Sequence, residues 1–371
     1  MTPHRRRAPR ANATVALAAC VVAALRATAH ASASTIDPSI AQPGVRPWIV
    51  ERAELHGLSS NALERASANV ETIVDRDCFV VARDGALVHE SYYHAEGAGA
   101  REAFSVDDAA GALATVLATG IAVDQGLFGL DEPLAKFGLA SVERAFGREY
   151  AEEVTVRQLL AQTHGGGRRA PGSAFERDNR DDGYLDIIGE LIEARSGMKL
   201  ENWARVHVAE PLGVPDLFSA ARQSGRASEA SLRRGLRASC RDVAKLAQVF
   251  VNKGAWLGED GRVKQLFDPS FALTAMSVSY PSLNQAHGLM TWLHVPTSKT
   301  GAKCCKPQTT ALACGESAED IDGPILGVDA PRAPVAVVVG DEGSMIYMMP
   351  ESRTVVVTLG RTVAGTPSAM T

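Results

Sequence analysis

The longest apolar stretch of the chain lies within residues 101–135 and has the spacing of a helix. Its apolar side chains recur three or four positions apart and so share one helical face. They are Leu113, Val116, Leu117 and Ile121. A polar turn at Phe104-Ser105 precedes the stretch, Gly126 ends it, and Leu130-Asp131-Glu132-Pro133 starts the next element. The pattern predicts one long apolar helix, with Ser105 at its beginning.

Strand patterns occur near both ends of the chain. Residues 78–93 predict two strands around Asp84-Gly85, a dipeptide typical of a tight hairpin turn. Residues 335–339 form an apolar run, and residues 344–360 predict a second hairpin. A helix is expected over 58–74, where Ser59, Ser60 and Asn61 are candidates for its N-cap.

The first 34 residues have the features of a targeting segment. A basic start is followed by an Ala-, Val- and Leu-rich core over 15–25, and small residues follow at 29–33. Arg26 interrupts the apolar run, so the run is too short to span a membrane. We expect 1–34 to be a signal segment that directs secretion, with an Arg-rich organellar transit peptide as the alternative. Residues 35–57, rich in Pro and polar side chains, are expected to be an entry linker.

The composition is that of a globular protein. The chain has 371 residues, of which 46% are hydrophobic and 22% are charged. Its net charge is −5. This balance argues against nucleic acid as a partner, because phosphate binding needs clustered Lys and Arg.

Several motifs, taken together, resemble one protein family. Residues 120–126 read G-I-A-V-D-Q-G, and 154–166 read V-T-V-R-Q-L-L-A-Q-T-H-G-G. Residues 187–197, 235–246 and 344–360 add three further matches. These segments resemble the penicillin-recognising serine hydrolases, which comprise serine β-lactamases, D,D-peptidases and related esterases. The resemblance implies an α+β fold of the β-lactamase/transpeptidase type over 58–371.

The implied architecture is an antiparallel sheet built from both chain ends and flanked by helices. A helical lobe over about 120–260 would be inserted between the two halves of the sheet, and the site would lie in the cleft between sheet and lobe. Residues 297–334 lie outside the resemblance and are expected to form an insert. No cofactor is implied.

In this family a serine at a helix N-terminus attacks a carbonyl group, and a lysine one turn later takes the serine proton. The matching segment here reads Ser105-Val106-Asp107-Asp108, so Asp108 stands where the lysine is expected, and residues 101–135 contain no lysine. Ser105 is therefore a candidate nucleophile without its usual base. Alternatively, S-x-x-D is a capping-box pattern, in which Ser105 only caps the helix.

The two remaining family motifs are altered as well. Arg180 falls where the family has a catalytic tyrosine, and Tyr184 is close by but out of phase. The third motif, K-T-G or H-x-G, falls on 339–343, where Gly340 is kept and Asp341 follows without a Lys or His. His164 opens a glycine-rich loop, for which a structural role is favoured. The pocket is thus expected to contain Asp108, His164, Arg180, Tyr184, Gly340 and Asp341.

Three cysteines cluster in the expected insert. In an exported chain, Cys304, Cys305 and Cys314 predict one local disulfide, from Cys314 to Cys304 or Cys305. A metal site is the competing interpretation, but the nearby His294 lies outside the cysteine cluster and is not at a spacing typical of metal ligands. We therefore expect no metal.

Three functional hypotheses follow. The first is a catalytically impaired member of the family, or pseudoenzyme, that keeps the cleft. The second is an active serine hydrolase for esters or amides that works through Ser105, with His164, Asp108 or Tyr184 as a substitute base. The third is an extracellular module that binds a small ester, amide or peptide-like ligand. The sequence does not indicate an oligomeric state.

Overall fold

The structure is a computed structural model of the whole chain. It describes residues 42–73, 76–93, 102–106, 109–175, 183–218, 231–294, 333–340 and 344–360. The predicted signal segment, the insert with Cys304, Cys305 and Cys314, and the site candidates Asp108, Arg180 and Asp341 lie outside these ranges.

One sheet dominates the described part of the chain, and both chain ends build it. The strand order is β1-β3-β2-β11-β10-β9-β8. Its strands are β1 (Ile49–Val50), β2 (Arg76–Arg83), β3 (Ala86–Tyr92), β8 (Trp292–His294), β9 (Val335–Val339), β10 (Met345–Met349) and β11 (Thr354–Gly360). All neighbouring strands are antiparallel except β1, which pairs with β3 in parallel. The expected fold class is confirmed, with one parallel edge strand added.

The two halves of the sheet meet where β2 pairs with β11. The turn between β2 and β3 has positive φ angles at Asp84 (52°) and Gly85 (80°), as a two-residue hairpin turn requires. The predicted hairpin is therefore confirmed. Further along, the register between β2 and β3 shifts between Val81 and Ala82. Val81 pairs with His89 and Ala82 with Leu87, so Val88 is the extra residue of a β-bulge.

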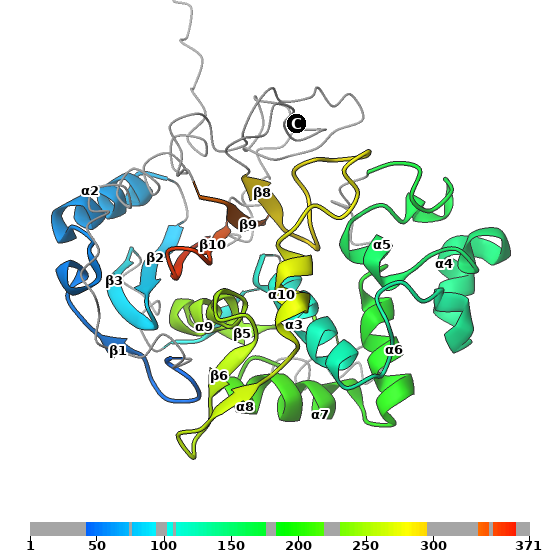
Figure 1. Cartoon of the computed structure of the whole chain (residues 1–371), viewed down its shortest axis with the longest axis horizontal. Coiled ribbons are helices and arrows are strands. Elements are labelled where there is room, and N and C mark those ends of the chain that lie inside the picture. The colour runs from blue at the N-terminus through cyan, green and yellow to red at the C-terminus, as the bar shows by residue number, and fades with distance from the viewer. Residues whose placement is uncertain are drawn as a thin grey trace, which may run out of the picture.

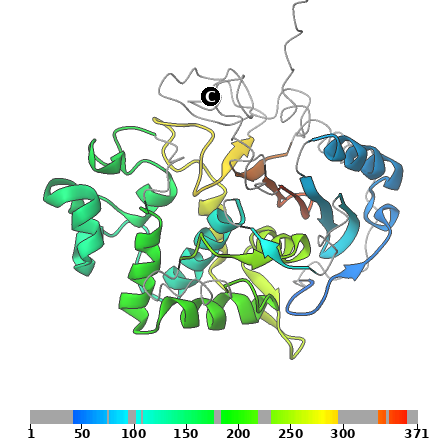
Figure 2. The ribbon, with the colours of Figure 1, turned by 180° about the vertical axis from the view of Figure 1, so that it is seen from behind.

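Helices cover both faces of the sheet. Helix α2 (Ser60–Glu71) packs on one face, against Phe79, Val81 and Val88. On the other face, α9 (Cys240–Val251) contacts β2, β10 and β11, and α3 (Ala109–Asp124) contacts β9 and β10. Both views place α2 at one end of the molecule and α4 (Ala140–Ala151) and α6 (Asp186–Ser196) toward the other (Figures 1 and 2).

The remaining elements connect or extend these layers. The helices are α4 (Ala140–Ala151), α5 (Val156–Leu160), α6 (Asp186–Ser196), α7 (Leu200–Ala204), α8 (Glu210–Leu212) and α10 (Pro269–Ala275). The 3₁₀ turns are η1 (Ala53–His56), η2 (Leu134–Phe137) and η3 (Gly165–Gly167), and η4 (Arg205–Ala209) is π-helical. Two small sheets pair β4 (Phe104–Ser105) with β5 (Arg237–Ala238) and β6 (Ala255–Leu257) with β7 (Val263–Gln265).

Side-chain caps fix the starts of α2 and α9, two of the helices that cover the sheet. The Ser59 hydroxyl accepts a hydrogen bond from the Ala62 amide at the start of α2, which confirms one of the expected caps. At the start of α9, Ser239 is the N-cap, and the Asp242 carboxylate accepts from its amide in return. This capping box assigns the cap to Ser239, with Asp242 as its reciprocal partner.

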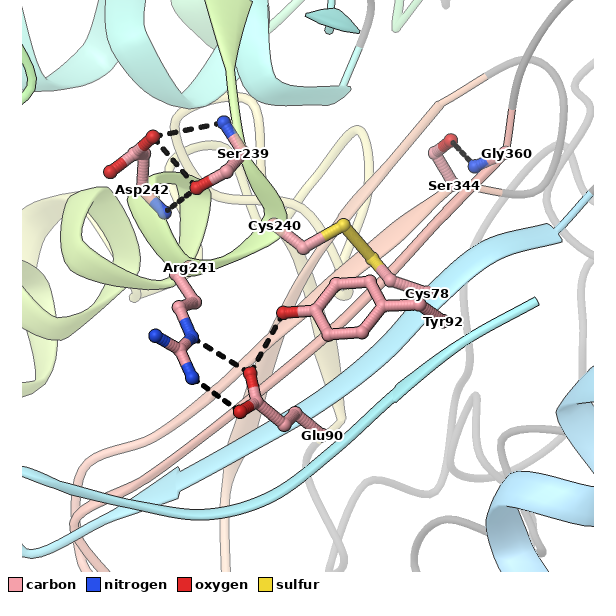
Figure 3. Close-up of a disulfide and its surroundings, with 9 residues drawn as sticks. All are labelled: Cys78, Glu90, Tyr92, Ser239, Cys240, Arg241, Asp242, Ser344 and Gly360. Carbon is pink, nitrogen blue, oxygen red and sulfur yellow. Dashed lines mark hydrogen bonds and ion pairs between the residues drawn. A yellow bond between two sulfur atoms is a disulfide. The ribbon is translucent and has the colours of Figure 1, made fainter. Parts of the chain in front are cut away.

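A disulfide joins the sheet to α9. Cys78 of β2 is bonded to Cys240, the first residue of α9, and both side chains are buried. Close to it, the Arg241 Nε donates a 2.7 Å hydrogen bond to Glu90 of β3, and a second guanidinium nitrogen donates to the other carboxylate oxygen (Figure 3). Covalent and ionic links thus hold the start of α9 on β2 and β3.

None of the helices in the described ranges has both the length and the apolar character needed to cross a bilayer.

Candidate active site

The family site would lie at the start of α3, the helix predicted from residues 101–135. This helix is buried from Ala109 to Ala122, which suits its apolar composition. Its first turn reads Ala109-Ala110-Gly111-Ala112. The turn therefore offers neither a hydroxyl group nor an amine where the family places its serine and lysine.

Ser105 lies before this helix, in strand β4. It pairs with Arg237 of β5, and its side chain is exposed. The next residue, Val106, continues the pairing, since its amide donates to the Leu236 carbonyl oxygen at 3.1 Å. The described part of α3 starts at Ala109, and residues 107 and 108 lie outside the described residues. Ser105 itself is paired with β5, whereas its predicted capping partner Asp108 is not described, so the capping-box interpretation stays a prediction.

Main chain fills the space beside the first turn of α3. A methyl group added at Gly111 would lie 2.3 Å from the carbonyl oxygen of Arg233, well inside van der Waals contact. The segment that carries this carbonyl is anchored on α6. There the Ser231 hydroxyl donates to Asp186 at 2.7 Å, and the Arg234 guanidinium forms an ion pair with the same carboxylate. Glycine is thus the residue that fits at position 111.

His164 and Tyr184, both expected in the pocket, come together with Phe146. The His164 ring centroid lies 4.5 Å from that of Tyr184 and 5.9 Å from that of Phe146. The Gly166 amide donates to His164 Nδ1 at 3.1 Å, and the Tyr184 hydroxyl donates to the Gly166 carbonyl oxygen at 2.9 Å. Both side chains therefore hold the glycine turn η3, as the structural interpretation of His164 predicts.

Burial makes His164 a weak base. Its side chain is buried among these rings, and desolvation of the charged form lowers the pKa of His164 to about 4. Its Nδ1 lone pair is already used by the Gly166 amide. An imidazole held in this way is poorly suited to take a proton from a serine.

Strand β9, which leads to the third motif, carries only Val and Ala over Val335–Val339. Gly340 follows, and its amide donates to the Ser344 carbonyl oxygen at 2.8 Å, which closes the hairpin to β10. Gly340 therefore has a role in the turn. Asp341 lies outside the described residues.

The described residues contain no group of three His, Cys, Asp or Glu side chains placed to hold a metal ion. Sequence reasoning missed the Cys78–Cys240 bond. A signal for it was present, since these two cysteines are the ones left over after the insert cluster and the leader are set aside.

Comparison with known proteins shows the family of the chain. The sequence profile of the family described as Beta-lactamase matches residues 77–369. The chain belongs to the Beta-lactamase family. A search of curated proteins finds no match.

Several solved structures share the fold at low sequence identity. A candidate beta-lactamase from Bacteroides dorei has a TM-score of 0.55 at 15% identity, over 82% of this chain and 90% of that one. A candidate 6-aminohexanoate-dimer hydrolase from Bacillus anthracis has a TM-score of 0.53 at 13% identity, over 97% and 92%. The octameric penicillin-binding protein homologue from Pyrococcus abyssi has a TM-score of 0.53 at 15% identity, over 82% and 73%. These likenesses show the fold.

Proposed function

We propose that this chain is a catalytically impaired member of the Beta-lactamase family that keeps the family cleft as a binding surface. The observation that carries the proposal is the first turn of α3, which is Ala109-Ala110-Gly111-Ala112. Acyl transfer by this family needs a nucleophile and a base at that turn. Two observations give further support. Strand β9 carries only apolar side chains, and His164 Nδ1 already accepts a hydrogen bond from the Gly166 amide.

The closeness of the Arg233 carbonyl to Gly111 strengthens the argument. An active site needs open space where the nucleophile meets a substrate carbonyl and where donors can stabilise the oxyanion. At Gly111 the space beside this turn is taken by main chain that two Asp186 contacts hold in place. A substrate that approached on the Gly111 side would meet that segment.

The test is exposure of the purified protein to a labelled penicillin, followed by intact-mass measurement. We expect no covalent adduct, in contrast to a serine β-lactamase treated in parallel. A stoichiometric adduct that maps to Ser105 and disappears in Ser105→Ala would contradict the proposal. Ser105 is the residue to watch because its hydroxyl is exposed on β4.

A stoichiometric adduct at Ser105 would favour the alternative function, an active serine hydrolase that acts through Ser105. The exposure of Ser105 is the observation on its side. Against it, β4 holds Ser105 in a strand and not in the first turn of a helix, where the N-terminus would stabilise the alkoxide.

We further propose that the protein is exported and binds a small ester, amide or peptide-like ligand outside the cytoplasm. The Cys78–Cys240 bond supports export, because disulfides persist in oxidising compartments. An intact-mass measurement of the exported protein tests the export, because removal of the first 34 residues would lower the mass accordingly. An unshortened chain in the exported fraction would contradict removal of the segment.

A further inference from the structure

A second group of reactive side chains lies on the opposite face of the sheet from α3, beneath helix α2. His89 and Ser91 belong to β3, and Glu64 belongs to α2. The hydroxyl Oγ of Ser91 lies 3.1 Å from His89 Nε2. The other ring nitrogen, Nδ1, faces Glu64 Oε1 at 3.9 Å.

The β-bulge at Val88 brings these side chains to this face. In a regular strand successive side chains alternate between faces, so Val88 and His89 would point to opposite sides. The extra residue places both toward α2: Val88 packs in the cluster beneath α2, and His89 pairs with Val81 of the same cluster. Ser91 pairs with Phe79, another member of that cluster, and therefore faces α2 as well. Bulges are common next to active sites, where they redirect side chains in this way.

We propose that Ser91, His89 and Glu64 form a nucleophile site that accepts the acyl group of small esters. Ser91 would be the nucleophile, His89 the base that takes its proton, and Glu64 the carboxylate that orients the base. This site is separate from the family cleft, so it does not depend on the function proposed for that cleft.

The charges favour the tautomer that the chemistry needs. A carboxylate facing Nδ1 stabilises a proton on that nitrogen, which leaves the lone pair of Nε2 free to accept from the Ser91 hydroxyl. Burial lowers the pKa of His89. The negative charges of Glu64 and Glu90 raise it by less, so the pKa stays below its ordinary value and the ring is neutral at neutral pH. The Phe79 ring, with its centroid 5.3 Å from that of His89, packs beside the imidazole.

The three side chains of the proposed site differ in exposure. The His89 side chain is only 8% exposed, whereas that of Glu64 is 71% exposed. Ser91 is half-buried. The neighbouring Tyr93 is fixed against α2, since its hydroxyl donates to the Ser67 carbonyl oxygen at 3.0 Å. Ser91 is therefore partly accessible to solvent, from where a small ester would approach it, while the base is shielded.

In the proposed reaction, Ser91 Oγ forms a bond to the ester carbonyl carbon and its proton passes to His89 Nε2. The carbon–alkoxide bond then breaks, and the leaving alcohol takes the proton from His89. Water, deprotonated by the same imidazole, hydrolyses the acyl-serine and restores the hydroxyl group. No oxidant, reductant or metal is needed for this balance.

A fluorophosphonate probe tests the proposal in the full-length protein. Its phosphorus is attacked by an activated serine and fluoride leaves, so each modified site gains a defined mass. We expect one adduct, which peptide mapping places at Ser91. Ser91→Ala should abolish it, and Ser352→Ala, which removes another half-buried hydroxyl in the turn between β10 and β11, should leave it unchanged.

The role of His89 is tested separately. His89→Gln should slow labelling about a hundredfold or more, as expected on loss of a general base, and Glu64→Gln should slow it less. Thermal unfolding of each variant confirms that it is folded. An unlabelled parent protein, an adduct elsewhere in place of Ser91, or a His89→Gln variant that labels at the parental rate would overturn the proposal. An additional adduct at Ser105 would leave it standing and contradict the function proposed for the family cleft.

Discussion

At Gly111, adding a methyl group has two opposite effects on the stability of the protein. In the middle of a helix, Gly→Ala usually stabilises by up to about 1 kcal/mol, because it restricts the unfolded chain. Here the new Cβ would lie 2.3 Å from the Arg233 carbonyl oxygen, which is main chain and cannot rotate away. We therefore expect Gly111→Ala to lower the free energy of unfolding by about 1–3 kcal/mol, measured by denaturant titration.

Two other glycines serve as controls. A methyl group at Gly120, also in α3, meets the Phe271 ring at 2.6 Å, and a side chain can shift, so the loss should be smaller. At Gly129 the nearest atoms are 3.4 Å away, at ordinary contact distance, and the change should be close to neutral. If Gly111→Ala were as stable as the parent, the 231–236 segment would not be fixed against α3.

His56 connects the entry segment to the β2–β3 turn through two carboxylates. Its Nε2 lies 2.6 Å from Glu51 and its Nδ1 lies 3.3 Å from Asp84. The hydrogen bond to Asp84 raises the pKa of His56, burial opposes it, and Glu51 adds to the rise. Burial raises the pKa of Asp84, but His56 and Arg353 outweigh it and the value ends below the ordinary one.

These shifts predict a window of stability. The contribution of a group with a raised pKa is complete below its unfolded value, about 6.5 for His, and is lost as pH rises through the folded value. That of Asp84 is present above about 3.8 and is lost as pH falls. His56→Gln should therefore destabilise the protein more at about pH 5.5 than at about pH 8.5, as measured by denaturant titration at both values. Asp84→Asn, which removes the partner, should show the same trend, and an equal loss at both pH values would contradict the ion-pair role.

At the scale of elements, the sequence was most informative where a pattern is local. The hairpin turn at Asp84-Gly85 needs positive φ angles that these residue types tolerate, so the turn and both strands could be predicted. The strand that contains Ser105 could not be predicted in this way. It depends on the pairing of Ser105 with Arg237 in β5, a contact between distant parts of the chain. Local spacing around Ser105 therefore did not reveal this strand.

The β-bulge in β3 escaped sequence reasoning for a related reason. An alternation of apolar and polar side chains reveals the faces of a strand only when one face is polar. Here both faces of β2 and β3 are covered: Leu87 packs in the core toward α3 and α9, and Val88 packs toward α2. An extra apolar residue leaves such a pattern intact, so the pairing of His89 with Ser91 on one face became apparent only in the structure.

At the scale of the whole molecule, the sheet brings residues from both halves of the chain together. The resemblance to the family was sufficient to predict this architecture, because the motifs near both ends belong to strands of one sheet. The cysteines show what the resemblance to the family did not predict. Proximity in sequence favoured a bond within the insert, whereas the fold brings Cys78 of β2 against Cys240 of α9, at a sequence separation of 162.

The Cys78–Cys240 bond should contribute strongly to stability. In the chain-entropy model a bond that closes a long loop restricts the unfolded chain, typically by about 2–4 kcal/mol. Cys78→Ala with Cys240→Ala should lose about this much, and reductant should then have no further effect on these two positions. Because both side chains are buried, part of the loss will come from the cavity left behind, so reduction of the parent protein isolates the contribution of the bond itself.

Peptide mapping of the exported protein without reductant tests both expected bonds together. We expect one linked pair of peptides that contains Cys78 and Cys240, as the structure shows. The sequence predicts a second pair, from Cys314 to Cys304 or Cys305, that closes a short loop in the insert. Free thiols at Cys304, Cys305 and Cys314, with the first pair intact, would contradict the insert bond alone. Exchange between the two sets, such as Cys78 linked to Cys314, would contradict the packing of α9 on β2, because Cys240 would then have left its partner.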